Sequence, residues 1–295
     1  MGRGDLSKDE WARLEPHLPA YGCRGGRWKD HCKVINGIYF RERAGVPWRD
    51  LPARFGKWKT IYERHRRWSA DGTWEKILTA VQADADAEDR VDWSQISVDS
   101  TICRAHQHAS GARKTAPERG KKGAPPARHS SDEGLGRSRG GLTTKIHLAS
   151  EGERRPLGLL VTPGQTHDGT VFEAVVEEIR VPRQGGGHPR TRPDALSADK
   201  AYSCRRIRSY LRRRQIPHSI LEKTDQIRHR LARGSAGGRP PAFDRASYKR
   251  RNEVERTINA LKNFRAVATR FDKRAYVFHG TVTVAAIRLW LWLRP

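Results

Sequence analysis

The sequence has no long apolar run, and this excludes a helical membrane protein. Its longest apolar tract, Val282–Leu293, is only 12 residues long and contains Arg288, whereas a membrane-spanning helix needs about 20 apolar residues. The first residues, MGRGDLSKDEW, contain no apolar segment of the kind found in secretory signal peptides. We therefore expect a cytoplasmic protein with no membrane partner.

Cysteine is scarce as well. The four cysteines are far apart and form no C-x-x-C pair, which excludes a disulfide-stapled miniprotein and a cysteine-based zinc site. Hydrophobic residues make up 36% of the chain and include nine Trp, enough for a packed core, so wholesale disorder is excluded too. We expect reduced thiols at Cys23, Cys32, Cys103 and Cys204.

Acidic residues are too few to balance the basic ones. The chain has 58 Lys and Arg against 33 Asp and Glu, a formal net charge of +25. Such a charge attracts polyanions, and nucleic acid is the partner we expect, ahead of an anionic membrane surface. Two segments hold most of the charge: residues 101–145 have a net charge of +7 and residues 205–251 of +12. We expect basic loops at 104–140 and 222–247, mobile without DNA and ordered by it, the alternative being solvated disordered segments.

The first 85 residues predict a small helical domain. Ser7 and Glu10 fit a capping box, with Leu6 and Trp11 at the staple positions around it. Helices are expected at about 7–18, 30–44, 57–69 and 74–81, with a tight turn at AGVPWRDLP before the third.

The third helix has an apolar stripe and a basic face. The stripe is formed by Trp58, Ile61, His65 and Trp68, so His65 is expected to be packed rather than catalytic. A helix, a short turn and a basic amphipathic helix together outline a helix-turn-helix DNA-binding domain. A plain helical bundle with a solvated basic face is the alternative. The predicted basic face consists of Lys59, Tyr62, Arg64, Arg66 and Arg67.

After an acidic linker at 86–94, residues 95–295 predict an α/β domain with a mixed sheet. Strands are expected at 96–98, 141–149, 155–164, 194–199 and 218–222, the second and third forming a hairpin around EGER. Helices are expected at 170–180 with Asp168 as N-cap, and at 202–214, 247–264 and 277–293. Three antiparallel strands followed by alternating helices and strands indicate an α+β protein overall.

Three carboxylates stand out by position. Asp99 and Asp199 each follow a short apolar strand, and sites in open α/β sheets form at such carboxyl ends. Glu255 lies in a helix whose neighbours are mostly basic. Each one alone is more typical of a structural role, but together they favour a site for Mg²⁺, which prefers carboxylate oxygens.

The helix around Glu255 carries four polar residues on one side. At 100° per residue, Tyr248, Arg251, Glu255 and Lys262 fall within an arc of about 60°. An ordinary amphipathic helix with an Arg251–Glu255 pair is the alternative interpretation. It does not explain why four different functional side chains share one arc.

The spacing Y-x2-R-x3-E-x6-K resembles the signature helix of the DDE transposases of bacterial insertion sequences, in the insertion-sequence-five type. SVDST, GRSRGGLTTKIH, LVTPGQTHD and LSADKAYS resemble the segments that precede it, in the expected order. LSKDEWARLEPHLP and VPWRDLPARFGKWKTIYERHRRW resemble the DNA-binding region of these proteins. Only 56 residues separate Asp199 from Glu255, which leaves no room for the β-rich insertion of some relatives.

This resemblance implies a ribonuclease-H-like catalytic domain in which Asp99, Asp199 and Glu255 bind two Mg²⁺ ions, with Mn²⁺ as a substitute. It implies nicking at the terminal inverted repeats of an element and joining of the 3′-hydroxyl to target DNA by a homodimer, without a small-molecule cofactor. The bacterial cytoplasm, at the nucleoid, is the implied location. A metal-dependent nuclease without strand transfer and a non-catalytic DNA-binding protein are the alternatives.

The resemblance also implies roles for basic residues. Arg251 and Lys262 would contact phosphates, and Tyr248 would position the strand. His167 and Asp168 are expected only to cap a helix. Further candidates for DNA contact are Arg137, Arg139 and Arg239, and on the basic face of the third helix Lys59, Arg66 and Arg67.

Overall fold

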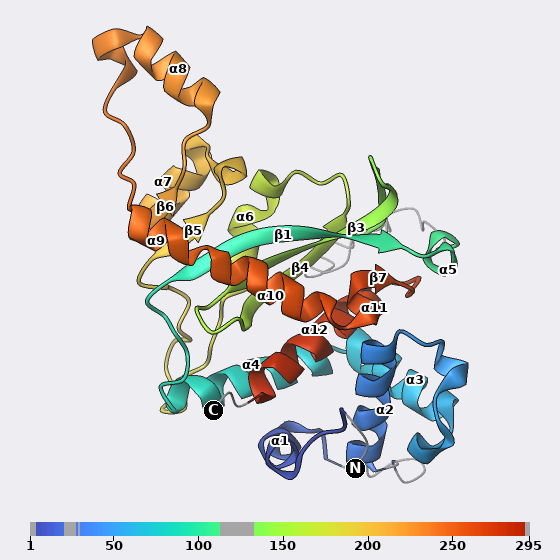
Figure 1. The fold of residues 1–295 in the computed structure, drawn as a ribbon. Coiled ribbons are helices and arrows are strands. Elements are labelled where there is room, and N and C mark those ends of the chain that lie inside the picture. Colours follow the sequence, from blue (N-terminus) through green and yellow to red (C-terminus); the bar gives the residue numbers. More distant parts are fainter. Residues whose placement is uncertain (1–3, 21–27, 29, 113–132, 293–295) are drawn as a thin grey trace, which may run out of the picture.

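The computed structural model describes residues 4–20, 28, 30–112 and 133–292 (Figure 1). The chain begins with four helices: α1 (Lys8–Leu14), α2 (His31–Ala44), α3 (Trp58–Ala70) and α4 (Thr73–Ala87). The capping box predicted at α1 is confirmed, since the Ser7 hydroxyl accepts from the Glu10 amide and the Glu10 carboxylate accepts from the Ser7 amide. The predicted helical start of the chain is therefore correct.

Two details of this region differ from the prediction. The segment between α2 and α3 is longer than one tight turn, because residues 45–57 contain the 3₁₀ turns η2 (Trp48–Asp50) and η3 (Ala53–Phe55). Arg64 is buried rather than on the basic face, because its guanidinium stacks on Trp28, 4.1 Å from the ring centroid. A cation–π contact with Trp28 thus stabilises Arg64 in a buried position, although the sequence predicts it on the surface.

Within the described residues, the sheet that follows has seven strands in mixed orientation. Along its main part the order is β4-β3-β1-β5-β6, and only β3 runs antiparallel to the others. This is the strand order of the ribonuclease-H-like fold, so the fold class predicted from the sequence is confirmed. The strands are β1 (Ile96–Ala105), β2 (Gly136–Ser138), β3 (Gly141–Ser150), β4 (Pro156–Pro163), β5 (Leu196–Ala198), β6 (His218–Ile220) and β7 (Thr269–Arg270).

Helices cover both faces of this sheet. α6 (Asp168–Glu177) packs on β1, β3 and β4, with α7 (Arg205–Arg213) beside it. α10 (Asn252–Lys262) crosses β1 and β3 on the other face (Figure 1). The remaining helical segments are η1 (Glu15–His17), α5 (Gln107–Ser110), η4 (Lys200–Tyr202), α8 (Thr224–Ala232), η5 (Gly234–Gly237), α9 (Arg245–Arg250), α11 (Arg265–Ala268) and α12 (Ala275–Leu291).

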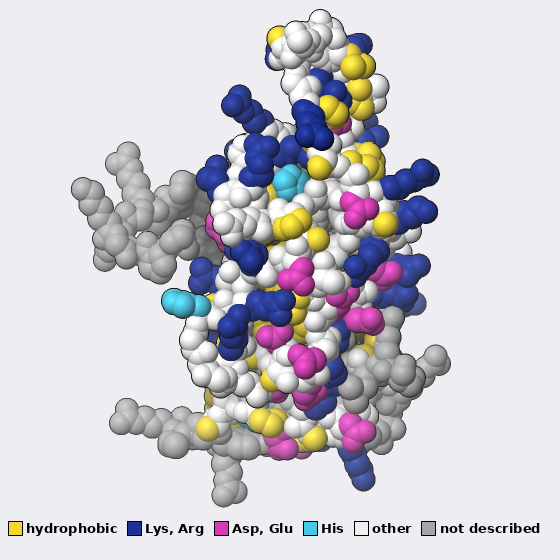
Figure 2. Space-filling view, turned by 90° about the vertical axis from the view of Figure 1, so that its left-hand side faces the viewer, with side chains coloured by type: hydrophobic (Ala, Val, Ile, Leu, Met, Phe, Trp, Pro, Cys, Tyr) yellow, Lys and Arg dark blue, Asp and Glu magenta, His cyan; other side chains and the backbone are white. Residues whose placement is uncertain are grey.

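Two predictions about the basic segments need correction. The predicted loop 222–247 contains α8 and η5, which form an arm that projects from the body (Figure 1). In Figure 2, Lys and Arg side chains gather below this arm, whereas Asp and Glu are more frequent further down. The predicted loop 104–140 is shorter than expected, because β1 extends to Ala105 and β2 lies at 136–138. The mobility predicted for the middle of this loop concerns residues 113–132, which lie outside the described residues.

The last helix, α12, joins the two parts of the molecule. It is buried along almost its whole length and packs against α3 and α4 as well as β4. At Gly280 the helices approach so closely that an added Cβ would lie 2.0 Å from the Ser69 hydroxyl oxygen. One continuous hydrophobic core therefore runs from Leu6 to Leu291. The domain boundaries at 85 and 94 stay a prediction, and none of the described helices is long and apolar enough to cross a membrane.

His65 is packed, as predicted, and this gives the protein a sensitivity to acid. Its side chain is fully buried and lies 3.2 Å from the Thr281 hydroxyl, and burial lowers its pKa to about 4. Because the folded state resists protonation of His65, stability is present above pH 6.5 and is lost as the pH falls towards 4. Between pH 7 and pH 5, the free energy of unfolding should fall about 2 kcal/mol further in the wild type than in His65→Gln.

Urea unfolding at the two pH values measures this difference. His108→Gln is the control, since His108 is exposed and the variant should follow the wild type. An equally steep fall in His65→Gln and the wild type would show that another group is responsible.

Candidate active site

Asp99 and Asp199 follow paired residues of two neighbouring strands. β1 and β5 are parallel and Val98 is paired with Ala198, so the residue after each of them is an aspartate. β5 ends at Ala198, as predicted for the strand before Asp199. The predicted end of the first strand at Val98 is wrong: β1 continues to Ala105 because β3 remains paired with it along this length. Asp99 therefore lies within a strand, at the level where its neighbour β5 stops.

The environment of Asp99 disfavours its charged form. Its side chain is 22% exposed, and one oxygen accepts a hydrogen bond from the Ser100 amide at 2.8 Å. Burial raises the pKa of Asp99, and the nearby carboxylates of Asp199 and Glu255 raise it further, against the opposing effects of the Ser100 amide and Arg251. A cation placed near Asp99 would favour its charged form.

Arg251 connects the sheet to the third carboxylate. The predicted helix 247–264 is broken at Arg251, between α9 and α10. Its guanidinium lies 3.3 Å from Asp99 Oδ2 and 2.7 Å from Glu255 Oε1, while the Tyr248 ring centroid is 5.6 Å away. Burial alone would lower the pKa of Arg251, but pairing with Glu255 raises it. Of the four side chains predicted to share one arc, Tyr248 and Glu255 thus lie beside Arg251, whereas Lys262 does not.

The donor set suits a hard divalent cation. It consists of carboxylate oxygens, which favour Mg²⁺ or Mn²⁺ over zinc. Among the described residues no group of three or more His, Cys, Asp or Glu side chains is close enough to hold an ion as it stands. Arg251 lies between Asp99 and Glu255 and pairs with both of them. The chemistry of the carboxylates therefore suits the metal, while the position between Asp99 and Glu255 is taken by a guanidinium.

Asp168 lies beside the candidate site, although the sequence predicts for it only the role of a helix cap. The predicted N-cap is wrong: His167 caps α6 by accepting from the Gly169 amide, and Asp168 is the first helical residue. One Asp168 oxygen accepts from the Ser100 hydroxyl at 2.8 Å and from Lys145 Nζ at 3.0 Å. Burial would raise the pKa of Asp168, but these two hydrogen bonds lower it overall. Asp168 therefore anchors the residue next to Asp99.

Tyr202 completes these surroundings. It is 2% exposed, and its hydroxyl lies close to Ser100. Burial raises its pKa well above the usual value, and Asp168, Asp99 and Asp199 add to the effect. The pairing of β1 with β3 places Ser100 and Lys145 close together, since Ser100 is opposite His147 and Ile102 is opposite Lys145. Asp168, at the start of α6, contacts both Ser100 and Lys145. No pattern in the sequence indicates the burial of Tyr202.

The other predicted DNA contacts lie elsewhere. Lys262 donates to the Ile102 carbonyl at 3.2 Å, three residues along β1 from Asp99. Arg137 and Arg139 are exposed on the β2–β3 hairpin, and Arg239 lines a groove of about 1210 Å³ beside α9. Lys59, Arg66 and Arg67 are exposed on α3, where Arg66 pairs with Glu63 at 2.8 Å.

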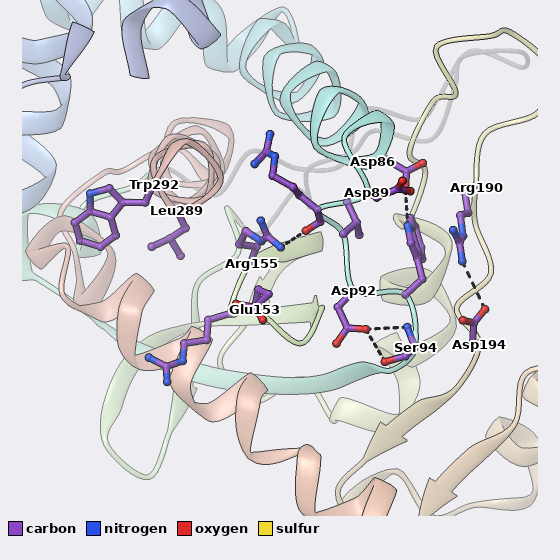
Figure 3. A pocket seen from close by; sticks show the side chains of 14 residues that line it. Asp86, Asp89, Asp92, Ser94, Glu153, Arg155, Arg190, Asp194, Leu289 and Trp292 are labelled. Carbon is purple, nitrogen blue, oxygen red and sulfur yellow. Dashed lines mark hydrogen bonds and ion pairs between the residues drawn. The ribbon is translucent and has the colours of Figure 1, made fainter. Parts of the chain in front are cut away.

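The pocket shown in Figure 3 is a separate feature. It lies where α4 leads into β1, next to the end of α12, and contains none of the three carboxylates. Its charges are largely paired, for example Arg190 with Asp194 at 3.5 Å and Arg250 with Asp92 at 2.8 Å. We assign it the structural role of fixing the acidic linker to the sheet.

Comparison with known proteins bears on both parts of the chain. A family model described as "Transposase DDE domain" matches residues 94–290, and one described as "Putative transposase of IS4/5 family" matches residues 6–78. Uncharacterized protein y4sN of Sinorhizobium fredii is 36% identical over 111 residues, which is 37% of this chain and 83% of that protein. A Brucella ovis protein named as a transposase for insertion sequence element IS6501 is 29% identical over 150 residues, 51% of this chain and 99% of that protein.

Among solved structures, the Mos1 strand transfer complex matches 92% of this chain and 79% of that chain, at 10% identity. The TM-score is 0.24, which is too low to define a shared fold.

Proposed function

The chain belongs to the DDE transposases, a family that acts on DNA, and we propose that it nicks the ends of an insertion sequence and joins the freed 3′-hydroxyl to target DNA. One observation carries this proposal. Asp99 and Asp199 follow paired residues of two parallel strands, and Arg251 links Asp99 to Glu255 on a helix. Both steps are in-line displacements at phosphorus, so a single site serves for nicking and for joining.

In this proposal Asp99, Asp199 and Glu255 hold two Mg²⁺ ions, or Mn²⁺ in their place. When bound, such a pair activates the attacking oxygen and stabilises the leaving one. Asp168, Ser100 and Lys145 keep Asp99 in position through the contacts described above. Arg251 and Lys262 bind phosphates flanking the scissile bond, and Tyr248 orients the strand.

The remaining basic residues suggest how the DNA is held. Arg137 and Arg139 contact the backbone near the site, and Arg239 contacts DNA that enters the groove beside α9. Lys59, Arg66 and Arg67 on α3 contact the terminal inverted repeat. Because two element ends must be brought together, we propose a homodimer on DNA.

The test is a cleavage and joining assay with purified protein. A labelled duplex that carries the end of the element is incubated with Mg²⁺ or with EDTA, beside a control duplex whose end sequence is shuffled. We expect nicking at the end and joined products in Mg²⁺ only. Nicking without joined products would favour a nuclease, and tight binding without nicking in any metal would favour a non-catalytic DNA-binding protein.

A further inference from the structure

A cleft of about 540 Å³ lies between the N-terminal helices and the far end of β1, and the proposed function does not use it. One wall comes from η2 and the start of α3, and the other from the segments that follow β1 and β7. Its aromatic lining residues are Trp48, Trp58, Tyr62, His106, His108 and Phe271.

Trp48 and Trp58 pack against the hydrophobic core but are not enclosed by it. On α3 the core is served by Ile61, His65 and Trp68, which are at most 1% exposed. Trp58 and Tyr62 are on the same helix but remain partly exposed. Across the cleft, the rings of His106 and Phe271 lie 4.8 Å apart at an interplanar angle of 40° and are also partly exposed. The cleft thus has partly exposed aromatic rings on both walls.

The rim of the cleft is cationic. Arg49 and Lys273 are exposed at its edge, and Arg49 lies 5.6 Å from the Trp58 ring centroid. Arg274 is exposed there too, but pairs with Glu133 at 3.1 Å. The single acidic lining residue, Asp272, is buried and paired with Arg41 at 3.2 Å. An occupant that suits aromatic walls and a positive rim is itself flat, aromatic and negatively charged, as a nucleotide is.

The position of the cleft connects it to the carboxylates. β1 leads from Asp99 to the cleft, where His106 comes seven residues later, a distance of about 23 Å along the strand. Lys262 and the exposed Arg104 lie between the two places. A DNA strand held by these cations at the active site would therefore reach the cleft.

We propose that the cleft holds one unpaired base of the DNA substrate, stacked on Trp58, with its phosphates on Arg49 and Lys273. A base that is still paired is stacked within the duplex and cannot enter a concave cleft, so it must be unpaired. This inference rests on the proposed function for the identity of the DNA.

The test measures binding in EDTA, so that no cutting occurs. A set of duplexes carries a single unpaired adenine, moved one position at a time inward from the element end, and a fully paired duplex serves as reference. We expect the wild type to bind one of the unpaired duplexes roughly tenfold more tightly than the reference, as base stacking on an aromatic ring would give. Trp58→Leu should lose this preference and Trp58→Phe should keep it.

Trp292→Leu is the matched control, because Trp292 is exposed and lies in the pocket of Figure 3 instead. It should behave as the wild type. The proposal is overturned if the wild type shows no preference at any position, or if Trp58→Leu retains it. It is also overturned if Trp58→Leu weakens binding to paired and unpaired duplexes equally, which would indicate a backbone contact only.

If the wild type prefers the unpaired base but shows no Mg²⁺-dependent nicking, the proposed function is wrong and the cleft is still a DNA site. If the wild type nicks DNA but shows no such preference, the proposed function stands and the cleft proposal is wrong.

Discussion

Glu255→Gln should lower both nicking and joining by roughly a thousandfold, on the scale of other losses of charge stabilisation at active sites. The substitution keeps the size of the side chain and its position on α10, but replaces the charged carboxylate of a proposed metal ligand with a neutral amide. Because nicking and joining use the same proposed site, both steps should fail together. Single-turnover rates on the labelled element end measure the first step, and a pre-nicked end offered with target DNA measures the second.

Glu253→Gln is the control for this experiment. Glu253 is on the same helix, two residues earlier, and pairs with Arg154 at 3.4 Å and Arg256 at 2.6 Å rather than with the candidate site. Its rates should stay close to those of the wild type. If Glu255→Gln retained most of its activity while Glu253→Gln lost it, our assignment of the third carboxylate would be wrong.

Arg251→Gln should bind Mn²⁺ at least tenfold more tightly than the wild type in the absence of DNA, and yet cut DNA far more slowly. Its guanidinium lies 3.3 Å from Asp99 and 2.7 Å from Glu255, the place that a cation would take. Removing a positive charge at such a distance changes the energy of a bound cation by a few kcal/mol at the effective dielectric of a protein surface, about 20. Cutting is lost because the proposed phosphate contact of Arg251 disappears.

Electron paramagnetic resonance of Mn²⁺ gives the metal affinity without any need for activity. Arg250→Gln is the matched variant, since Arg250 is adjacent but pairs with Asp92 at 2.8 Å. Its affinity for Mn²⁺ should equal that of the wild type. An Arg251→Gln protein with unchanged or weaker Mn²⁺ binding would mean that Arg251 does not compete with the metal.

The sequence predicts the elements that have a local signal. The capping box at Ser7 and Glu10 fixes the start of α1, and the hairpin of β3 and β4 forms around EGER as expected. The arrangement of Tyr248, Arg251 and Glu255 also follows from helical periodicity, since i and i+3 or i+4 positions lie on one side. Asp99 and Asp199 are predicted as a pair because each follows a short apolar stretch.

What the sequence does not predict depends on contacts between distant segments. β1 runs past Asp99 because its partner β3 is long, and nothing near residue 99 reveals this. Arg64 is buried because Trp28 and Trp68 lie beside it, although its position in α3 is that of a surface residue. Asp168 shows the same limit: the usual place for an acidic cap is taken by His167, and the carboxylate turns to Ser100 and Lys145 instead.

The packing of α12 has a consequence for synthesis of the protein on the ribosome. Trp68 and Trp74 are 1% exposed in the finished molecule, and α12 is the helix that packs across α3 and α4, which carry them. While residues 275–291 are still untranslated, the N-terminal helices lack this partner and keep apolar surface exposed. A nascent chain should therefore acquire its full affinity for DNA only late in translation, and a product terminated before residue 275 should be a target for chaperones and proteases.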